Sequence, residues 1–141
     1  MQPSNTLIAA LKRFEGFHSK AYCCPAGVWT IGYGHNRNVR QGQTVTESQA
    51  EAFLRNDIAN AAAYANTLHG VKTQGQFDAV VDFIYNCGIT NFNNSTLKRY
   101  IVAGRPAADI QAQFLRWNKA NGKVLAGLTK RRQWEADRWA E

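Results

Sequence analysis

Three side chains near the start of the sequence have the chemistry of a hydrolytic site: the carboxylate of Glu15, the thiol of Cys24 and the hydroxyl of Thr30. Glu15 comes at the end of an apolar-periodic stretch, which predicts a helix whose C-terminus disfavours negative charge. Partial burial beside Phe14 and Phe17 would also raise the pKa of Glu15. A carboxyl group that stays protonated near neutral pH is suited to general acid catalysis.

The residues after Glu15 are typical of a small antiparallel sheet. Short β-branched and aromatic stretches at 21–22, 28–31 and Tyr33 predict strands, which are separated by Pro and Gly residues. Gly16 can end the preceding helix. The predicted sheet therefore folds back over Glu15.

The order of these residues resembles the phage-type lysozymes, the T4-lysozyme-like endolysins of glycoside hydrolase family 24. The resemblance is carried by Glu15-Gly16, Ala21-Tyr22 and the run GVWTIGYGH at 27–35. The family has a Glu, an Asp nine residues later and a Thr six residues after that. The same spacing here gives Glu15, Cys24 and Thr30, so a cysteine stands where the family usually has its Asp. Some members of the family also have Cys at this position.

The resemblance continues along nearly the whole chain, through TQGQFDA at 73–79, YNCG at 85–88, NSTL at 94–97 and GLTKRRQWE at 127–135. It implies an α+β, lysozyme-like and mostly helical fold, with residues 1–141 as one catalytic domain. The expected parts are a small antiparallel sheet lobe (17–45), a long connecting helix (46–68) and a larger helical lobe (69–141 with 1–16).

Local patterns in the sequence agree with a mainly helical chain. Ser4 or Asn5 can cap the first helix, and the TESQ sequence at 46–49 is a capping box that opens the long helix. Helical spacing of apolar residues predicts further helices. They are expected at 73–88, 95–102, 106–117 and from 127 onward, with a loop or short turn at 89–94 and a turn at 121–122.

The resemblance also implies roles for the three candidate catalytic residues. Glu15 would protonate the glycosidic oxygen of the leaving sugar, and Thr30 would help to hold the attacking water. Cys24 has three open roles, as the base that activates this water, as a nucleophile on the anomeric carbon, or as a neutral thiol that only positions water. We rank water activation ahead of covalent attack. Both need the thiolate, although an unperturbed thiol has a pKa of about 8.5.

Three further residues support this site in the family pattern: Gly34, expected to bind substrate, and His35 and Arg131, expected to assist. His35 closes a turn, where a structural hydrogen bond or ion pair fits better than catalysis. Arg131 is either a solvated charge or pairs with Glu15 across the cleft. Such a pair would lower the pKa of Glu15, against the effect of the helix end.

The chain has only three cysteines, an odd number, so a disulfide framework is not expected. Cys23 is expected to face away from Cys24, because successive strand side chains alternate. The simplest interpretation of Cys87, and the competing one of Cys24, is a small buried hydrophobe. The Cys and His residues lack the spacing of zinc ligands, so we expect neither a metal nor a cofactor.

The composition and net charge of the chain limit its expected cellular location and binding partners. The net charge of +7 favours a polyanionic partner. The sequence has no secretory signal, no membrane-spanning stretch and no nucleic-acid-binding signature. The expected location is the host bacterial cytoplasm until lysis, with action on the wall in the periplasm. The expected partners are peptidoglycan glycan strands and a separate holin for release, with the protein as a monomer and without membrane insertion.

The predicted function is that of an endolysin muramidase, which hydrolyses the β-1,4 bond between N-acetylmuramic acid and N-acetylglucosamine in peptidoglycan and lyses the host cell. One alternative is a lytic transglycosylase, although Thr30 argues against it because it holds water in the hydrolases. Another is a non-catalytic peptidoglycan-binding protein, in which Cys24 marks lost activity. A nucleic-acid-binding domain is given little weight.

Overall fold

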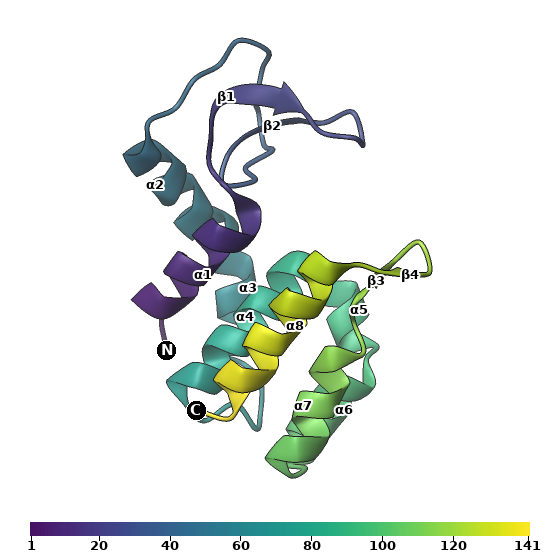
Figure 1. The fold of residues 1–141 in the computed structure, drawn as a ribbon. Coiled ribbons are helices and arrows are strands. Elements are labelled where there is room, and N and C mark those ends of the chain that lie inside the picture. Colours follow the sequence, from purple (N-terminus) through teal and green to yellow (C-terminus); the bar gives the residue numbers. More distant parts are fainter. The chain divides into compact units, whose positions relative to one another are not determined.

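The computed structural model describes residues 1–141, which form eight helices and four short strands (Figure 1). The elements are, in order, α1 (Asn5–Glu15), β1 (His18–Cys23), β2 (Trp29–Gly32), α2 (Glu47–Asp57), α3 (Ala59–Ala65), α4 (Gln74–Cys87), α5 (Ile89–Asn93), α6 (Thr96–Val102), α7 (Ala107–Leu115), β3 (Lys119–Ala120), β4 (Lys123–Val124) and α8 (Ala126–Trp139). A mostly helical chain with a small antiparallel sheet confirms the predicted fold class.

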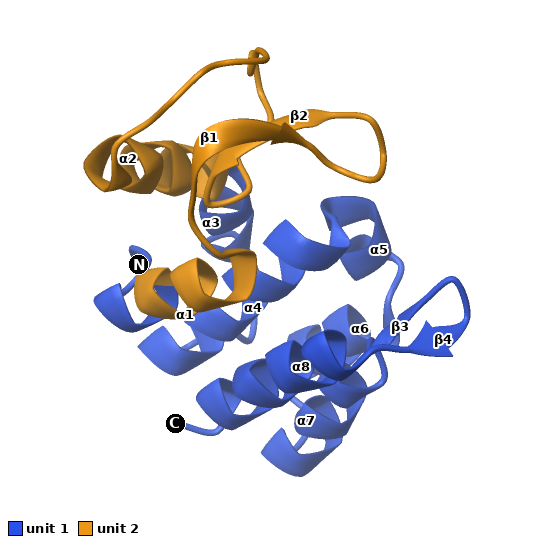
Figure 2. Cartoon of the chain, turned by 45° about the horizontal axis from the view of Figure 1, so that its top comes forward, with its two compact units in different colours: residues 1–7, 60–141 blue, residues 8–59 orange.

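The chain divides into two compact units, coloured separately in Figure 2. The helical unit contains residues 1–7 and 60–141, and the sheet unit contains residues 8–59. The sheet unit therefore extends beyond the predicted lobe of 17–45, because most of α1 and all of α2 belong to it.

The sheet unit is built around the antiparallel pair β1 and β2, in which Tyr22 lies opposite Thr30 and Cys23 opposite Trp29. Residues 43–45 run beside β1, where Ala21 N–H donates to the carbonyl of residue 43 over 2.9 Å. Ile31 of β2 is fully buried, as is Ala50 of α2, which packs on this strand. This sheet confirms the predicted strand at 21–22 and most of the strand predicted at 28–31, but Val28 lies in the hairpin loop and Tyr33 lies in a turn rather than in a strand.

The core of the helical unit is α4, which packs against α8. Its apolar residues repeat at helical spacing and are buried, namely Phe77, Val80, Val81 and Ile84. A Cβ at Gly75 would lie 2.3 Å from the carbonyl oxygen of Arg138, so glycine allows the start of α4 to approach the backbone of α8. Close backbone packing therefore joins these two helices.

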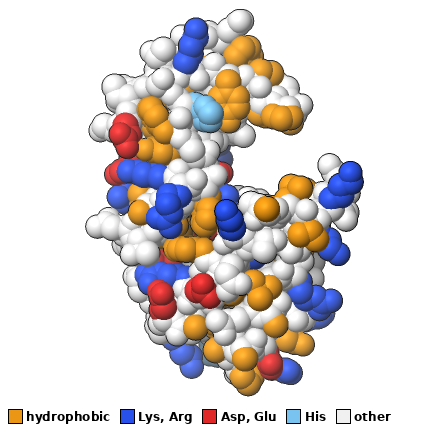
Figure 3. All heavy atoms as spheres, in the orientation of Figure 1, with side chains coloured by type: hydrophobic (Ala, Val, Ile, Leu, Met, Phe, Trp, Pro, Cys, Tyr) orange, Lys and Arg blue, Asp and Glu red, His pale blue; other side chains and the backbone are white.

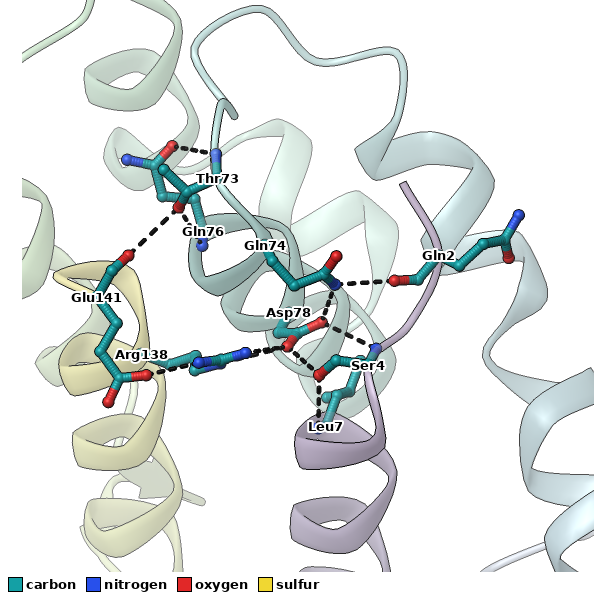
Figure 4. A network of polar contacts seen from close by, with 9 residues as sticks. All are labelled: Gln2, Ser4, Leu7, Thr73, Gln74, Gln76, Asp78, Arg138 and Glu141. Atoms are coloured by element: carbon teal, nitrogen blue, oxygen red, sulfur yellow. Dashed lines mark hydrogen bonds and ion pairs between the residues drawn. The ribbon is translucent and has the colours of Figure 1, made fainter.

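One buried carboxylate, that of Asp78 on α4, joins several segments of the helical unit (Figure 4). It accepts hydrogen bonds from the backbone N–H and hydroxyl of Ser4, and from Gln74 Nε2 over 2.9 Å. Arg138 of α8 donates Nη2–H over 2.8 Å. Because Gln74 Nε2 also donates to the carbonyl of Gln2 over 2.8 Å, the N-terminal segment is fixed to the centre of this unit.

The capping predictions are confirmed, with Ser4 rather than Asn5 as the first cap. Ser4 Oγ accepts from Leu7 N–H over 3.0 Å. The capping box at 46–49 forms as expected, since Thr46 Oγ1 accepts from Gln49 N–H and Gln49 Oε1 accepts from Thr46 N–H.

The predicted single helix over 46–68 is wrong. Helical hydrogen bonding is interrupted at Ile58, which separates α2 from α3, and α3 ends at Ala65. The break follows Asn56 and Asp57, which are weak helix formers, and the Asp57 carboxylate is bound by His35 rather than left at a solvated helix surface.

Two smaller predictions in the helical unit also need correction. Residues 89–94, expected as a loop or short turn, contain the five-residue helix α5 with Phe92 buried. The turn at 121–122 is confirmed, but it closes a hairpin of β3 and β4 that was not predicted. Asn121 and Gly122 both have positive φ (51° and 76°), as a two-residue hairpin turn requires.

None of the helices combines the length and the apolar character needed to cross a membrane. On the face drawn in Figure 3, Lys and Arg side chains (blue) outnumber Asp and Glu (red) and are spread over the surface. This distribution agrees with the net charge of +7.

Candidate functional site

Glu15 is the last residue of α1 and is half-buried. The helix ends where Gly16, with φ of +72°, donates its N–H to the carbonyl of Lys12 over 3.0 Å. Gly34 lies against the Glu15 side chain, because a Cβ at Gly34 would be 3.5 Å from the carboxyl carbon. Gly34 has φ of +80°, which favours glycine, so this turn leaves room for the carboxylate.

Cys24 is the first residue of the hairpin loop between β1 and β2. Its N–H donates to the carbonyl of Val28 over 2.9 Å, and its carbonyl accepts from Gly27 N–H over 2.8 Å. These two bonds fold residues 24–28 into a tight loop around the Cys24 side chain. The thiol is partly exposed to solvent.

Hydrogen-bond donors around the sulfur lower the pKa of Cys24 below the ordinary thiol value. The largest contribution comes from the backbone of Val28, followed by that of Ala26, and the hydroxyl of Thr30 acts in the same direction. Desolvation opposes them, with an effect smaller than that of either backbone donor but larger than that of Thr30. Donors aimed at a thiolate favour the charged form, so this loop promotes ionisation without a neighbouring cation.

Thr30 is buried in β2, and its hydroxyl has two acceptors within reach, the carbonyl of Val28 and the sulfur of Cys24. It donates to the carbonyl of Val28 over 3.1 Å and also interacts with the Cys24 sulfur. A hydroxyl has one hydrogen, so it can donate to only one of them at a time. Turning from the carbonyl to the sulfur would stabilise the thiolate when Cys24 loses its proton.

His35 has the structural interaction that the sequence suggested. Its Nδ1 lies 2.9 Å from Oδ2 of Asp57, at the end of α2, and its ring stacks on Phe53 with centroids 4.3 Å apart. Its backbone pairs with that of Ile31 in β2. His35 therefore fixes the turn that contains Gly34 to α2.

Arg131 belongs to the helical unit, where it is buried on α8. It is not a solvated charge, because Nε and Nη2 bind the two carboxylate oxygens of Asp82 over 3.0 and 2.8 Å. The expected pairing of Arg131 with Glu15, like the substrate-binding role of Gly34, stays a prediction.

The other cysteines differ from Cys24 in their surroundings. Cys23 is exposed, and Cys87, at the end of α4, is partly buried rather than in the core. The Cys87 sulfur lies 2.6 Å from Nη1 of Arg132, yet burial outweighs this cation and raises the pKa of the thiol. The chain has no cluster of three or more His, Cys, Asp or Glu residues able to hold a metal ion.

The acidic partners Asp57 and Asp82 were missed by the sequence reasoning. Asp82 had a usable signal, because it lies in the apolar run of α4 and buried carboxylates require partners. Asp57 had none, since its partner His35 is 22 residues away in the sequence. The backbone donors of Ala26 and Val28 were equally invisible, because they depend on how the loop folds.

Known proteins with the same features identify the family. Residues 12–135 match the model of the phage lysozyme family. The chain belongs to the phage lysozyme family. It is 46% identical over 140 residues to an endolysin of Acyrthosiphon pisum secondary endosymbiont phage 1, a match that covers 96% of this chain and 95% of the relative.

Two other similarities extend this result. An endolysin of Bacillus phage PZA is 44% identical over 96% of this chain, which spans about half (54%) of that relative. The muramidase domain of SpmX from Asticaccaulis excentricus has the same fold, with a TM-score of 0.90, 36% identity and coverage of 99% of this chain and 98% of the domain. As a phage lysozyme, this protein is an enzyme that acts on peptidoglycan.

Proposed function

We propose that this phage lysozyme is an endolysin muramidase, which hydrolyses the β-1,4 bond between N-acetylmuramic acid and N-acetylglucosamine. Glu15 is the general acid, Cys24 the general base and Thr30 the residue that holds the attacking water. The observation that carries this proposal is the set of hydrogen-bond donors around the Cys24 sulfur, from Val28, Ala26 and Thr30. These donors favour the thiolate that a general base requires. The similarity to the SpmX muramidase domain supports the choice of bond.

The proposed reaction needs only these residues and one water molecule, and its proton transfers balance. Glu15 gives its proton to the glycosidic oxygen of the departing sugar, while water adds to the anomeric carbon. The proton of that water goes to the Cys24 thiolate, and it returns to Glu15 through solvent after the products leave. Direct attack of the thiolate on the anomeric carbon is the second choice, because Thr30 beside the sulfur suits a residue that orients water.

Mass spectrometry of the muropeptides released from purified peptidoglycan tests this function. Products with reducing N-acetylmuramic ends are expected, because water is the acceptor. Anhydro ends would replace the hydrolase with a lytic transglycosylase. A folded protein that binds the wall without releasing products would instead be a peptidoglycan-binding protein with a disabled site.

We also propose that the protein acts as a monomer and reaches the wall at lysis through a separate holin. Bacteria that express it alone should remain turbid until chloroform opens the cytoplasmic membrane, and should then clear. The Glu15→Gln variant is the matched control and should not clear. Spontaneous clearing by the wild-type protein would contradict the need for a holin.

A further inference from the structure

An exposed pair of aromatic rings in tilted contact lies on β1, outside the residues given a role so far. The rings of His18 and Tyr22 have centroids 4.3 Å apart with an interplanar angle of 46°, and both side chains are exposed. Tyr22 keeps 36% of its surface accessible. In the sheet unit of Figure 3, hydrophobic side chains (orange) and a histidine (pale blue) lie together on the surface.

The register of the sheet connects this pair with the catalytic residues. Tyr22 is directly opposite Thr30 in the β1–β2 ladder, and cross-strand partners project from the same face of a sheet. Tyr22 also precedes Cys24 by two residues, a distance of about 7 Å along an extended chain. Tyr22 is therefore placed on the face of the sheet that carries Thr30, two residues before Cys24 in the sequence.

The chemistry of the pair suits a sugar ring. A tyrosine ring offers a large, rigid apolar surface with a polar tip, and pyranose rings present an apolar face of C–H groups that packs on such surfaces. The tilted ring contact with His18 restricts the motion of the Tyr22 ring, so less conformational freedom is lost when a ligand binds. Phe17, also exposed, has a different contact, because its ring packs on Tyr33 at 5.4 Å.

We propose that Tyr22, oriented by His18, is a stacking platform for one pyranose ring of the glycan strand, next to the bond that is cleaved. The inference rests on the proposed function, since it assigns the platform to the same substrate. Tyr22 is a substrate-contact residue and takes no part in proton transfer. Its contribution is to the binding of the strand, in the ground state and the transition state alike.

Kinetics on purified peptidoglycan test the platform through KM and kcat. Tyr22→Ala should raise KM about tenfold and leave kcat within about twofold, as expected for the loss of one aromatic contact. Tyr22→Phe should behave like the wild type, because it keeps the ring. His18→Ala should raise KM by a smaller factor of about three, because the platform remains but is less restrained.

Tyr100→Ala is the matched control, because Tyr100 is a partly exposed tyrosine of the helical unit that stacks on Arg105. It should leave KM unchanged. An unchanged KM for Tyr22→Ala, or an equal rise for Tyr100→Ala, would overturn the platform. A fall in kcat at constant KM would also overturn it, because Tyr22 would then act on the reaction rather than on binding.

A binding assay separates failure of the platform from failure of the proposed function. Glu15→Gln is combined with Tyr22→Ala, and the fraction of protein that sediments with insoluble peptidoglycan is measured against Glu15→Gln alone. The double variant should bind about tenfold more weakly. Because the assay needs no turnover, equal binding would overturn the platform even where muropeptide analysis supports the muramidase.

Discussion

Cys24 and Cys87 have the same side chain, but their surroundings shift the pKa of the thiol in opposite directions. Cys24 lies in a tight, partly exposed loop, in which backbone N–H groups and a hydroxyl favour the thiolate. Cys87 is beside a full positive charge on Arg132, yet its pKa is raised because burial dominates. The comparison shows that burial can outweigh an adjacent cation at one thiol, whereas hydrogen-bond donors lower the pKa of a thiol that is little desolvated.

The carboxylates of the two units continue this contrast. Glu15 is half-buried at a helix end beside a glycine, whereas Glu135 of α8 is fully buried. Burial and the neighbouring Asp82 raise the pKa of Glu135, against the opposing effect of Arg132. The buried charges of the helical unit fix the packing of α4 and α8, whereas the Glu15 and Cys24 side chains of the sheet unit are partly exposed.

The largest effect is expected from Glu15→Gln, which removes the proton of the general acid. Muropeptide release should fall by about a thousandfold, while the thermal unfolding temperature stays close to that of the wild type. Glu51→Gln is the control in the same unit, because Glu51 is an exposed carboxylate paired with Lys12, and its activity should be unchanged. Retained lysis by Glu15→Gln would remove Glu15 from the mechanism.

Substitution of the two cysteines separates their roles. Cys24→Ala should lower the rate of muropeptide release by about a hundredfold, because the general base is lost, and Cys24→Asp should restore most of it. Cys87→Ala should keep the rate but lower the free energy of unfolding by about 1 kcal/mol, because it removes a partly buried side chain. Full activity in Cys24→Ala would leave Cys24 without a catalytic role.

The rate of alkylation measures how readily each of the two thiols ionises and how accessible it is. At pH 7.5, iodoacetamide should modify Cys24 at least about tenfold faster than Cys87, because a lowered pKa and exposure both increase the available thiolate. As pH rises, the Cys24 rate should reach half of its maximum at a lower pH than the Cys87 rate, because the pKa is lowered at Cys24 and raised at Cys87. Peptide mapping by mass spectrometry gives both rates. Similar midpoints would mean that the donors around Cys24 are ineffective.

The smallest effect concerns the pH dependence of stability. A carboxyl group whose pKa is raised in the native state contributes stability that is fully present below its unfolded value, here 4.5, and is lost as pH rises through the native value. In urea unfolding, the advantage of the wild type over Glu135→Gln should therefore shrink as pH rises above about 4.5.

The exposed Glu51 supplies a control of opposite sign for this measurement. Lys12 and Arg55 lower the pKa of Glu51, so its contribution is present above 4.5 and is lost as pH falls through the native value. The difference between wild type and Glu51→Gln should accordingly grow with pH. Parallel stability curves for wild type and Glu135→Gln would show that Glu135 binds its proton equally in both states.

Much of the fold could be predicted from the sequence, because local rules determine its parts. The cap at Ser4, the capping box at 46–49 and the turn at 121–122 depend on neighbours within four residues, and all three form. The interruption at Ile58 was missed, since it coincides with the contact of Asp57 with the distant His35. The short helix at 89–93 was missed because its many Asn residues favour a loop on propensity alone.

The site was predictable in residue type but not in physical environment. The spacing of Glu15, Cys24 and Thr30 indicated the family, and the structure brings Cys24 and Thr30 together. The sequence indicated that an unperturbed Cys24 would keep its proton near neutral pH, whereas backbone donors lower its pKa here. Such donors depend on the conformation of the loop rather than on residue identity, so they cannot be predicted from the pattern of side chains.

The contacts of Asp78 have a consequence for how the molecule opens. Ser4, ahead of α1, and Arg138, near the end of α8, are held by the same buried carboxylate, so release of either one removes part of the hydrogen bonding that a buried charge needs. The two ends of the helical unit should therefore open as one cooperative event rather than fray separately. In native-state hydrogen exchange, the amides of residues 5–8 and 135–139 would share one opening free energy, and Asp78→Asn would lower it for both segments together.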